Sequence, residues 1–258
     1  LVKFIDSNDD LSVQVHPNDD MAKRLHNGMG KTEMWYVLSA EPGACIYAGF
    51  QKALSPEEYA RRVADGTIMD TLAKHEIYAG DVFYIPSGRI HAIGKGVRLV
   101  EVQQSSDLTY RIYDYGRMDL NGQPRELHTD LAAQALDYKV YREYRSDYTD
   151  KIDTANACID TEFFTVRVVS IKEPIRRNMV NYDSFVIATC MQGSCTIRIR
   201  STHDEVQLNE GFSCLIPAAI ADYDIIPNTP EAKLLEAYIN NNTQQPSTFR
   251  RFISQFLH

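Results

Sequence analysis

Four side chains in the first hundred residues carry ligand atoms that a first-row divalent metal ion prefers. Gln14 and His16 lie two positions apart, so on a strand both side chains point to the same face. Glu33 begins a second strand-like run, and His91 follows a third. Antiparallel strands could bring these nitrogen and oxygen donors to one point. Such a site would suit zinc, and also manganese, cobalt or iron.

A simpler interpretation of the same residues is open. A Gln-x-His pair on a strand is usually part of a polar surface, and only the combination with Glu33 and His91, each near a turn, favours a metal site. None of the five cysteines falls in this cluster, which argues against a structural zinc site. Their odd number and the absence of a Cys-x-x-Cys pair indicate reduced thiols, as in a cytoplasmic protein.

Short strand-like runs must position these donors. The runs alternate apolar and polar residues at period two, are rich in Val, Ile, Tyr and Phe, and are bounded by Gly and Pro turns. We expect strands over residues 1–5, 11–15, 33–38, 44–49, 81–85, 97–102, 163–171, 184–190, 194–200, 205–208, 212–216 and 233–239. So many short strands indicate a mainly β fold, either a sandwich, a barrel or a jelly roll.

A helical insert interrupts the strands of the first half. Ser55-Pro56-Glu57-Glu58 has the N-cap, the first-turn proline and the acidic first turn of a helix, and Gly66 is a plausible end. The run from Thr67 to about His75 suggests a second short helix. We therefore expect a two-helix insert at about residues 51–79.

The composition changes near the middle of the chain. Thr129–Tyr138 is alanine-rich and favours a helix, and it leads into the polar, tyrosine-rich segment 139–153. This change predicts a helical and polar linker at residues 128–158. The linker would separate a first unit, residues 1–127, from a second unit, residues 159–258.

The two units repeat each other's spacing. Each has an acidic residue ten positions before a turn glycine, and a later glycine that precedes a proline by six positions. The spacing aligns Glu33 with Asp183, and His91 with Asp222. These matches predict a duplicated β-unit. The second copy has no counterpart of the Gln14 and His16 pair, so we expect it to be degenerate and to lack metal ligands.

The chain resembles type I mannose-6-phosphate isomerases (phosphomannose isomerases) of the short bacterial form in four ordered segments: S-V-Q-V-H-P, K-T-E-M-W-Y-V-L, P-S-G-R-I-H-A-I-G and S-S-D-L-T-Y-R-I-Y-D-Y-G-R. The resemblance is strong to about residue 138 and weaker through the second unit. It implies two cupin-type β-barrel or jelly-roll units, with one zinc ion per chain in the first. Family members carry a further N-terminal segment, so we expect upstream sequence before Leu1, which reads as part of a strand already under way.

The resemblance also implies roles for individual residues. It makes Gln14, His16, Glu33 and His91 the zinc ligands. The residues that it places around the substrate are Arg111 as the catalytic arginine, Lys31 in the active site, Ser12 beside the substrate, and Glu101 and Asp107 as acidic active-site residues. Longer members have a histidine where this chain has Gly30. An acid/base role for that histidine is therefore either dispensable here or carried by another residue.

The reaction that the resemblance implies is the interconversion of mannose 6-phosphate and fructose 6-phosphate in mannose metabolism. A proton moves between C2 and C1 through a cis-enediol, while a metal ion stabilises the developing negative charge. Arg111 and Lys31 would bind substrate, and Arg111 could hold either the oxyanion or the phosphate. The base stays open among Glu101, Asp107 and Lys31. Without the resemblance, Lys31 and Arg111 would be read as solvated strand-end charges.

Two other classes of function stay open. The first is another metal-cupin enzyme, an oxygenase or an epimerase; an oxygenase would be expected to use iron, so metal analysis and oxygen consumption would identify it. The second is a vestigial or non-catalytic protein that only binds a sugar phosphate. Binding without turnover would identify that class.

Composition and charge limit the partners. The 258 residues carry a formal charge of −8, which disfavours nucleic acid because a phosphate backbone needs a basic face. A small anionic substrate is still compatible, because a local pair of cations can bind one phosphate on an acidic protein. No apolar run approaches the roughly 18 residues of a membrane span, so no membrane partner is expected. The oligomeric state cannot be derived from the sequence.

Overall fold

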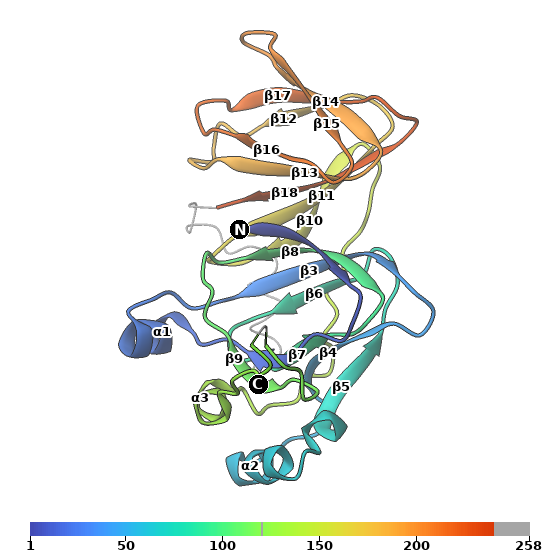
Figure 1. The fold of residues 1–258 in the computed structure, drawn as a ribbon. Coiled ribbons are helices and arrows are strands. Elements are labelled where there is room, and N and C mark those ends of the chain that lie inside the picture. Colours follow the sequence, from blue (N-terminus) through green and yellow to red (C-terminus); the bar gives the residue numbers. More distant parts are fainter. Residues whose placement is uncertain (120, 240–258) are drawn as a thin grey trace. The chain divides into compact units, whose positions relative to one another are not determined.

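In a computed structural model that describes residues 1–119 and 121–239, the chain folds as two compact units that divide between Ser146 and Asp147 (Figure 1). The fold is mainly β, as the strand-like runs predict. The division between the units falls inside segment 128–158, and the helix of that segment belongs to the first unit.

Two antiparallel sheets make up the first unit. Its strands are β1 (Val2–Ser7), β2 (Val13–Val15), β3 (Glu33–Ala40), β4 (Cys45–Phe50), β5 (Leu72–Glu76), β6 (Val82–Ile85), β7 (His91–Ile93), β8 (Val97–Gln103) and β9 (Tyr110–Tyr113). One sheet has the order β1-β8-β3-β6 and the other β5-β4-β7-β2-β9. Apolar side chains from both sheets form one core, among them Trp35 and Leu99 from the first sheet and Ile46 and Ile93 from the second. Facing antiparallel sheets of this kind are typical of a jelly roll.

Helices bury the outer face of the second sheet. They are α1 (Asp19–His26), α2 (Pro56–Ala64) and α3 (Thr129–Ala135). Tyr59 of α2 and Ala132 of α3 pack in one cluster with Val13, Ala92 and Ile112 from the sheet. The outer faces of strands β2, β7 and β9 therefore pack against these helices.

The helical insert contains one α-helix rather than two. Helix α2 begins as predicted, with the Ser55 hydroxyl accepting the N–H of Glu58. The predicted second helix from Thr67 to about His75 is confirmed only in its first half, as a 3-10 helix over Ile68–Thr71, and is wrong in its second half, which is strand β5. Leu72–Glu76 alternates between buried and exposed side chains and pairs with β4, so a free strand edge decides the conformation of this segment.

The second unit also contains two antiparallel sheets. Its strands are β10 (Thr154–Asp160), β11 (Thr165–Ile171), β12 (Ile175–Asn178), β13 (Val186–Gln192), β14 (Ser194–Ile199), β15 (Glu205–Asn209), β16 (Ser213–Ile216), β17 (Asp222–Pro227) and β18 (Ala232–Tyr238). One sheet has the order β10-β11-β18-β13-β16 and the other β12-β17-β14-β15. The predicted second unit extends to residue 258, and residues 240–258 lie outside the described residues. No helix in the described part of the chain is long and apolar enough to cross a membrane.

Candidate metal centre

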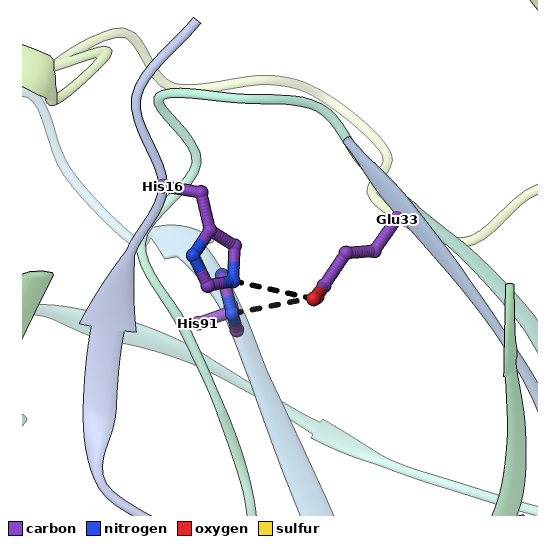
Figure 2. A group of neighbouring side chains, drawn as sticks. All are labelled: His16, Glu33 and His91. Atoms are coloured by element: carbon purple, nitrogen blue, oxygen red, sulfur yellow. Dashed lines mark ion pairs between the residues drawn. The ribbon is translucent and has the colours of Figure 1, made fainter. Parts of the chain in front are cut away.

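Three buried side chains converge at one end of the first unit (Figure 2). His16 directly follows β2, Glu33 is the first residue of β3, and His91 is the first residue of β7. The His16 Nε2 atom lies 3.3 Å from Glu33 Oε1, and the His91 Nε2 atom lies 3.6 Å from Glu33 Oε2. All three side chains are about 1% exposed. Within the described ranges, they form the one group of at least three His, Cys, Asp or Glu side chains with ligand atoms this close, all within 4.8 Å.

Backbone carbonyls orient both imidazole rings. The Nδ1 atom of His16 lies 2.9 Å from the carbonyl oxygen of Leu108, and the Nδ1 atom of His91 lies 2.8 Å from that of Arg89. A carbonyl oxygen only accepts hydrogen bonds, so each Nδ1 carries the proton and donates it. In the neutral form of each ring, the Nε2 that faces Glu33 then carries the lone pair, which is the arrangement of metal-binding histidines with fixed tautomers.

Two ligand atoms of this group have no partner. His16 Nε2 and Glu33 Oε2 are buried without a hydrogen-bond partner, whereas Glu33 Oε1 pairs with Lys31 and His91 Nε2 accepts from Gln14. Buried polar atoms of this kind destabilise a protein unless something pairs with them. Two imidazole nitrogens and a carboxylate are the donor set of a first-row divalent ion, so the residues present fit such an ion.

The electrostatics of the group favour its metal-binding protonation states. Burial, with a further contribution from His16, lowers the pKa of His91 to about 3. Burial alone would raise the pKa of Glu33, but His16, His91 and Lys31 together hold that pKa well below its usual range. Lys31 is itself buried, and its Nζ lies 2.9 Å from Glu33 Oε1. At neutral pH His91 is neutral and Glu33 is ionised, so both are ready to bind a cation.

Gln14 lies beside the group, with its amide nitrogen towards it. Gln14 pairs in register with His91, and its Nε2 donates to His91 Nε2 over 3.2 Å. The Ser12 hydroxyl donates to Gln14 Oε1 at 3.4 Å. Half a turn of the terminal amide would exchange its oxygen and nitrogen. The oxygen could then join the ligand set, and Ser12 could accept from the amide nitrogen.

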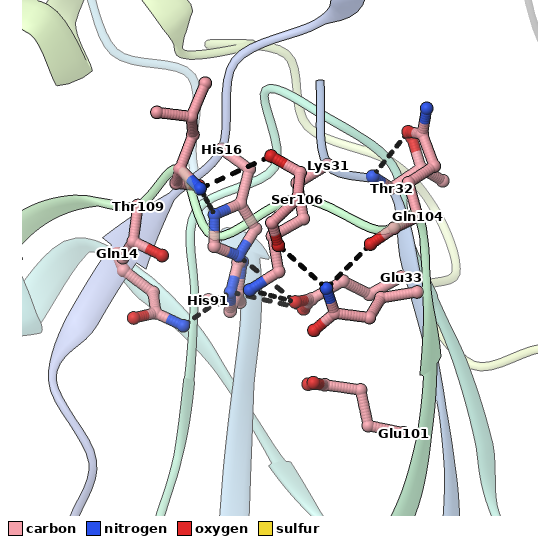
Figure 3. Close-up of polar contacts among 12 residues, drawn as sticks. Gln14, His16, Lys31, Thr32, Glu33, His91, Glu101, Gln104, Ser106 and Thr109 are labelled. Atoms are coloured by element: carbon pink, nitrogen blue, oxygen red, sulfur yellow. Dashed lines mark hydrogen bonds and ion pairs between the residues drawn. The ribbon is translucent and has the colours of Figure 1, made fainter. Parts of the chain in front are cut away.

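Glu101 and Lys31 line the same region (Figure 3). Glu101 is 5% exposed, although it carries a carboxylate. Its Oε2 accepts the indole N–H of Trp35 at 3.0 Å, and its Oε1 accepts from Lys3 Nζ at 3.0 Å. These two donors hold the Glu101 carboxylate in one orientation.

Arg111 and Asp107 are placed differently. Arg111 pairs in register with Gln14, but its Nη1 donates to the carbonyl of Glu126 at 2.9 Å. Burial and the nearby Arg125 lower the pKa of Arg111. Asp107 is exposed, next to the residue whose carbonyl orients His16. The structure thus brings Gln14, Lys31 and the three buried side chains together, and leaves Arg111 and Asp107 at the periphery.

Sequence reasoning missed two residues of this region. Lys3 donates to Glu101 and also to the side-chain oxygen of Gln103. Trp35 belongs to the core, and it also donates to Glu101 and contacts the His91 ring edge-on at 5.4 Å between centroids. Both residues pair with Glu101 across strands, β1 and β3 being the neighbours of β8. Only knowledge of that pairing could have identified them.

The second unit has a different set of residues at the corresponding positions. Its sheets repeat the strand order of the first unit, with β18, β13 and β16 in the places of β8, β3 and β6. Glu33 pairs with Ile85, and Val186 pairs with Ile216, so Val186 and not Asp183 corresponds to Glu33. The alignment of Glu33 with Asp183 is therefore wrong.

The alignment of His91 with Asp222 is also wrong, because strand alternation separates two neighbouring residues. Asp222 is partly exposed and binds Arg176 at 2.7 Å, whereas Tyr223 is fully buried in the core. Tyr223 pairs in register with Arg177, as His91 pairs with Gln14. A shift of one residue between the turn and the strand reverses which side chain points inward, and spacing from a glycine cannot reveal it.

Arg177 and Tyr223 form a buried ion-pair network with Glu236. Arg177 Nη2 lies 2.6 Å from Glu236 Oε2, and the Tyr223 hydroxyl donates to Glu236 Oε1 at 2.9 Å. Glu236 is fully buried and pairs with Ala188, as Glu101 pairs with Trp35 in the first unit. An arginine guanidinium thus supplies the positive charge in the second core.

Comparison with known proteins agrees with this architecture. The family described as "Mannose-6-phosphate isomerase, cupin domain" matches residues 153–229. The chain is 34% identical over 226 residues to the probable mannose-6-phosphate isomerase GmuF of Bacillus subtilis, covering 87% of this chain and 71% of GmuF. It is 48% identical over 136 residues to the mannose-6-phosphate isomerase of Streptococcus mutans, covering 53% of this chain and 43% of that protein.

A solved structure extends the similarity over nearly the whole chain. The mannose 6-phosphate isomerase from Bacillus subtilis matches with a TM-score of 0.83 and 32% identity, covering 93% of this chain and 74% of that chain. The sequence segments, the jelly-roll sheets and these relatives agree. The chain therefore belongs to the type I mannose-6-phosphate isomerases, enzymes of the cupin superfamily.

Proposed function

We propose that this chain interconverts mannose 6-phosphate and fructose 6-phosphate through a cis-enediol, with one zinc ion held by Gln14, His16, Glu33 and His91. The observation that carries the proposal is the buried group of two imidazoles and one carboxylate, in which His16 Nε2 and Glu33 Oε2 have no hydrogen-bond partner. The chain's relatives, described as mannose-6-phosphate isomerases, give the substrate class.

In the proposed reaction, the metal ion and the chain's own residues have different roles. A zinc ion at this place would act as a Lewis acid that stabilises negative charge on the substrate oxygens next to the migrating proton. Lys31, 2.9 Å from a Glu33 oxygen, adds a second positive charge in a water-poor site, where fixed charges act strongly. Ser12 orients Gln14 and is close enough to the ligands to contact a bound sugar.

Glu101 is the best-supported proton carrier. Its carboxylate is buried, fixed by Trp35 and Lys3, and lies on the wall next to the metal ligands. A base must be held in place to exchange a proton with one carbon and then with its neighbour. Lys31 stays an alternative, and Asp107 is less favoured because its exposed position would let water compete for the proton.

Arg111 supports the binding of the phosphate. Its strand neighbours Gln14, and the nearby Arg117 and Arg125 share the carboxylate of Asp114, while Glu126 adds a second carboxylate. Three guanidinium groups beside two carboxylates leave a local excess of positive charge. Such an excess favours a phosphate dianion even in a chain with a net charge of −8.

The proposed setting follows from the same features. All five cysteines are free thiols, which suits a reducing, cytoplasmic location. The substrate is a small sugar phosphate, and neither nucleic acid nor a membrane is part of the proposal.

A coupled assay tests the proposal. Mannose 6-phosphate is supplied, and formation of fructose 6-phosphate is followed with and without a chelator, on the wild type and on Arg111→Ala. We expect turnover that stops on chelation and returns with zinc, and a large loss in the variant. Turnover that resists the chelator, or full activity of Arg111→Ala, would contradict the mechanism. Zinc binding without turnover would favour a protein that only binds sugar phosphates.

A further inference from the structure

The loop between β6 and β7 touches both histidines of the metal centre. Gly88, at its middle, has a φ of +85° and donates its N–H to the carbonyl of His16 at 2.9 Å. Its own carbonyl accepts the N–H of Asp137 at 2.8 Å. The Ile90 carbonyl, at the end of the loop, accepts the N–H of Gly49 at 2.8 Å. The conformation of this loop therefore depends on β4 and on the segment that follows α3.

Arg89, the next residue of the loop, lies against two aromatic rings of that segment. Its guanidinium carbon is 4.6 Å from the ring centroid of Tyr141 and 5.0 Å from that of Tyr144. Its Nη1 donates to the carbonyl of Tyr84 at 3.4 Å. A guanidinium that faces two rings is held by cation–π attraction as well as by packing. None of the proposed catalytic steps uses this side chain.

The two rings are themselves fixed. The Tyr144 hydroxyl donates to the carbonyl of Phe50 at 2.9 Å, and the Tyr141 hydroxyl donates to Asp137 Oδ2 at 2.5 Å. Tyr144 also lies directly on Gly49, where an added Cβ would come within 2.2 Å of the ring. The absence of a side chain on Gly49 thus allows Tyr144 to reach the strand. The rings form a rigid surface, and Arg89 is the loop residue that binds to it.

The loop carries the acceptor that orients His91. The Nδ1–H of His91 donates to the backbone carbonyl of Arg89 itself, at 2.8 Å. Any rotation of the Arg89 peptide would lengthen or break that bond and let the His91 ring turn. Outer contacts of this kind tune metal affinity by fixing the tautomer and direction of a ligand.

We infer that Arg89 is a positioning residue of the metal centre: held against the rings of Tyr141 and Tyr144, it fixes the carbonyl that orients His91. The segment 137–144, which the sequence presents as part of a linker, is then a support of the site. The inference rests on the proposed function, because it takes His91 as a metal ligand.

Zinc affinity and an NMR signal together test this role. Zinc affinity is measured by competition with a chromogenic chelator, on Arg89→Met and on the matched control Arg145→Met. Arg145 is also an arginine over an aromatic ring, 5.4 Å from the Phe83 centroid, and it also forms an ion pair with Asp81, the residue before β6. We expect zinc affinity to fall by roughly tenfold in Arg89→Met and to stay unchanged in Arg145→Met.

The second readout needs no metal. In the metal-free protein, the Nδ1–H of His91 should give a shifted proton signal, correlated to imidazole nitrogen, that reports its bond to the carbonyl. We expect the signal to be lost or displaced in Arg89→Met and retained in Arg145→Met. If Arg89→Met does not fold, Arg89→Lys is measured in the same way, because an ammonium keeps the charge but has no flat face to lie against the rings.

The outcomes separate this inference from the proposed function. Unchanged zinc affinity and an unchanged His91 signal in a folded Arg89 variant would overturn the positioning role. Equal losses in Arg145→Met would overturn it as well, since any loss of a packed arginine would then suffice. A wild type that binds no zinc would refute the proposed function, while the NMR signal would still decide whether Arg89 orients His91.

Discussion

The metal-free protein is expected to lose stability as the pH falls below 6.5, because buried His91 resists protonation. Burial lowers the pKa of His91 from an ordinary value of 6.5 to about 3. Below pH 6.5 the unfolded chain therefore takes up a proton that the folded chain does not, so acid favours unfolding. One such group changes the free energy of unfolding by about 1.4 kcal/mol per pH unit, or about 2 kcal/mol between pH 6.5 and 5.0.

Glu33, the other buried side chain of the group with a lowered pKa, does not contribute between pH 6.5 and 5.0. The pKa of Glu33 is held below its ordinary value of 4.5, so its contribution is lost only at lower pH. Two kcal/mol is a large fraction of the roughly 5–15 kcal/mol that stabilises a typical domain. The loss should therefore be easy to measure.

Trp35 fluorescence provides the assay. Trp35 is the only tryptophan and is buried in the first unit, so its emission reports the unfolding of that unit. Urea unfolding with a chelator present is compared at pH 6.5 and 5.0, on the wild type, on His91→Gln and on the control His203→Asn. His203 is exposed in the second unit, at a φ of +63° that Asn tolerates.

The comparison of the two variants shows whether His91 causes the loss of stability in acid. We expect His91→Gln to remove most of the pH dependence and His203→Asn to keep it. An equally steep loss of stability in His91→Gln would show that another group causes the acid sensitivity. A wild type with the same stability at both pH values would show that His91 is not a buried neutral imidazole.

Three further outcomes are expected. Glu33→Gln keeps the shape of the side chain but removes its charge, and should weaken zinc binding more than about 100-fold in the chelator competition, since even outer contacts account for 10–100-fold. Trp35→Phe removes one hydrogen bond to Glu101, and should destabilise the first unit by about 1 kcal/mol in urea and lower kcat with zinc affinity unchanged. Arg177→Met leaves the buried Glu236 charge unpaired, and should cost about 3–5 kcal/mol in calorimetry without changing the zinc content.

Each outcome has a contrary result. Wild-type zinc affinity in Glu33→Gln would remove Glu33 from the ligand set. Unchanged kcat in Trp35→Phe would mean that the orientation of Glu101 does not matter to turnover. For the second unit, Arg177→Met combined with Glu236→Gln is the control, because it removes both charges; if the double variant is no more stable than the single one, the buried charge is not the cause.

The sequence predicted features that depend on neighbouring residues. Period-two patterns located most strands, and the Ser55 N-cap located helix α2. The same alternation places Gln14 and His16 on one face of β2, and the structure shows both beside His91. Segments with many charged residues were harder, and β12, with the sequence Ile-Arg-Arg-Asn, was not predicted as a strand.

Features that depend on strand pairing could not be derived in this way. Lys3 reaches Glu101 from a residue 98 positions away, because β1 pairs with β8. Leu72–Glu76 became a strand because β4 offered a free edge. Tyr223 replaces His91 in the second core through a shift of one residue, which leaves the glycine spacing intact and reverses the inward face. Each of these features depends on how strands distant in the sequence pair, and local sequence patterns carry no information about that pairing.

The Arg177–Tyr223–Glu236 network has a consequence for how the protein meets changes in metal supply. The positive charge of this network is the Arg177 guanidinium, which is covalently part of the chain. It cannot be removed by a chelator, lost on dilution or replaced by a competing ion. The second unit therefore keeps its internal charge balance at any metal concentration. With the proposed zinc ion bound by its buried carboxylate and imidazoles, the first unit would gain stability in proportion to the logarithm of the metal concentration. Metal starvation would then destabilise the first unit and leave the buried ion pair of the second unit unchanged.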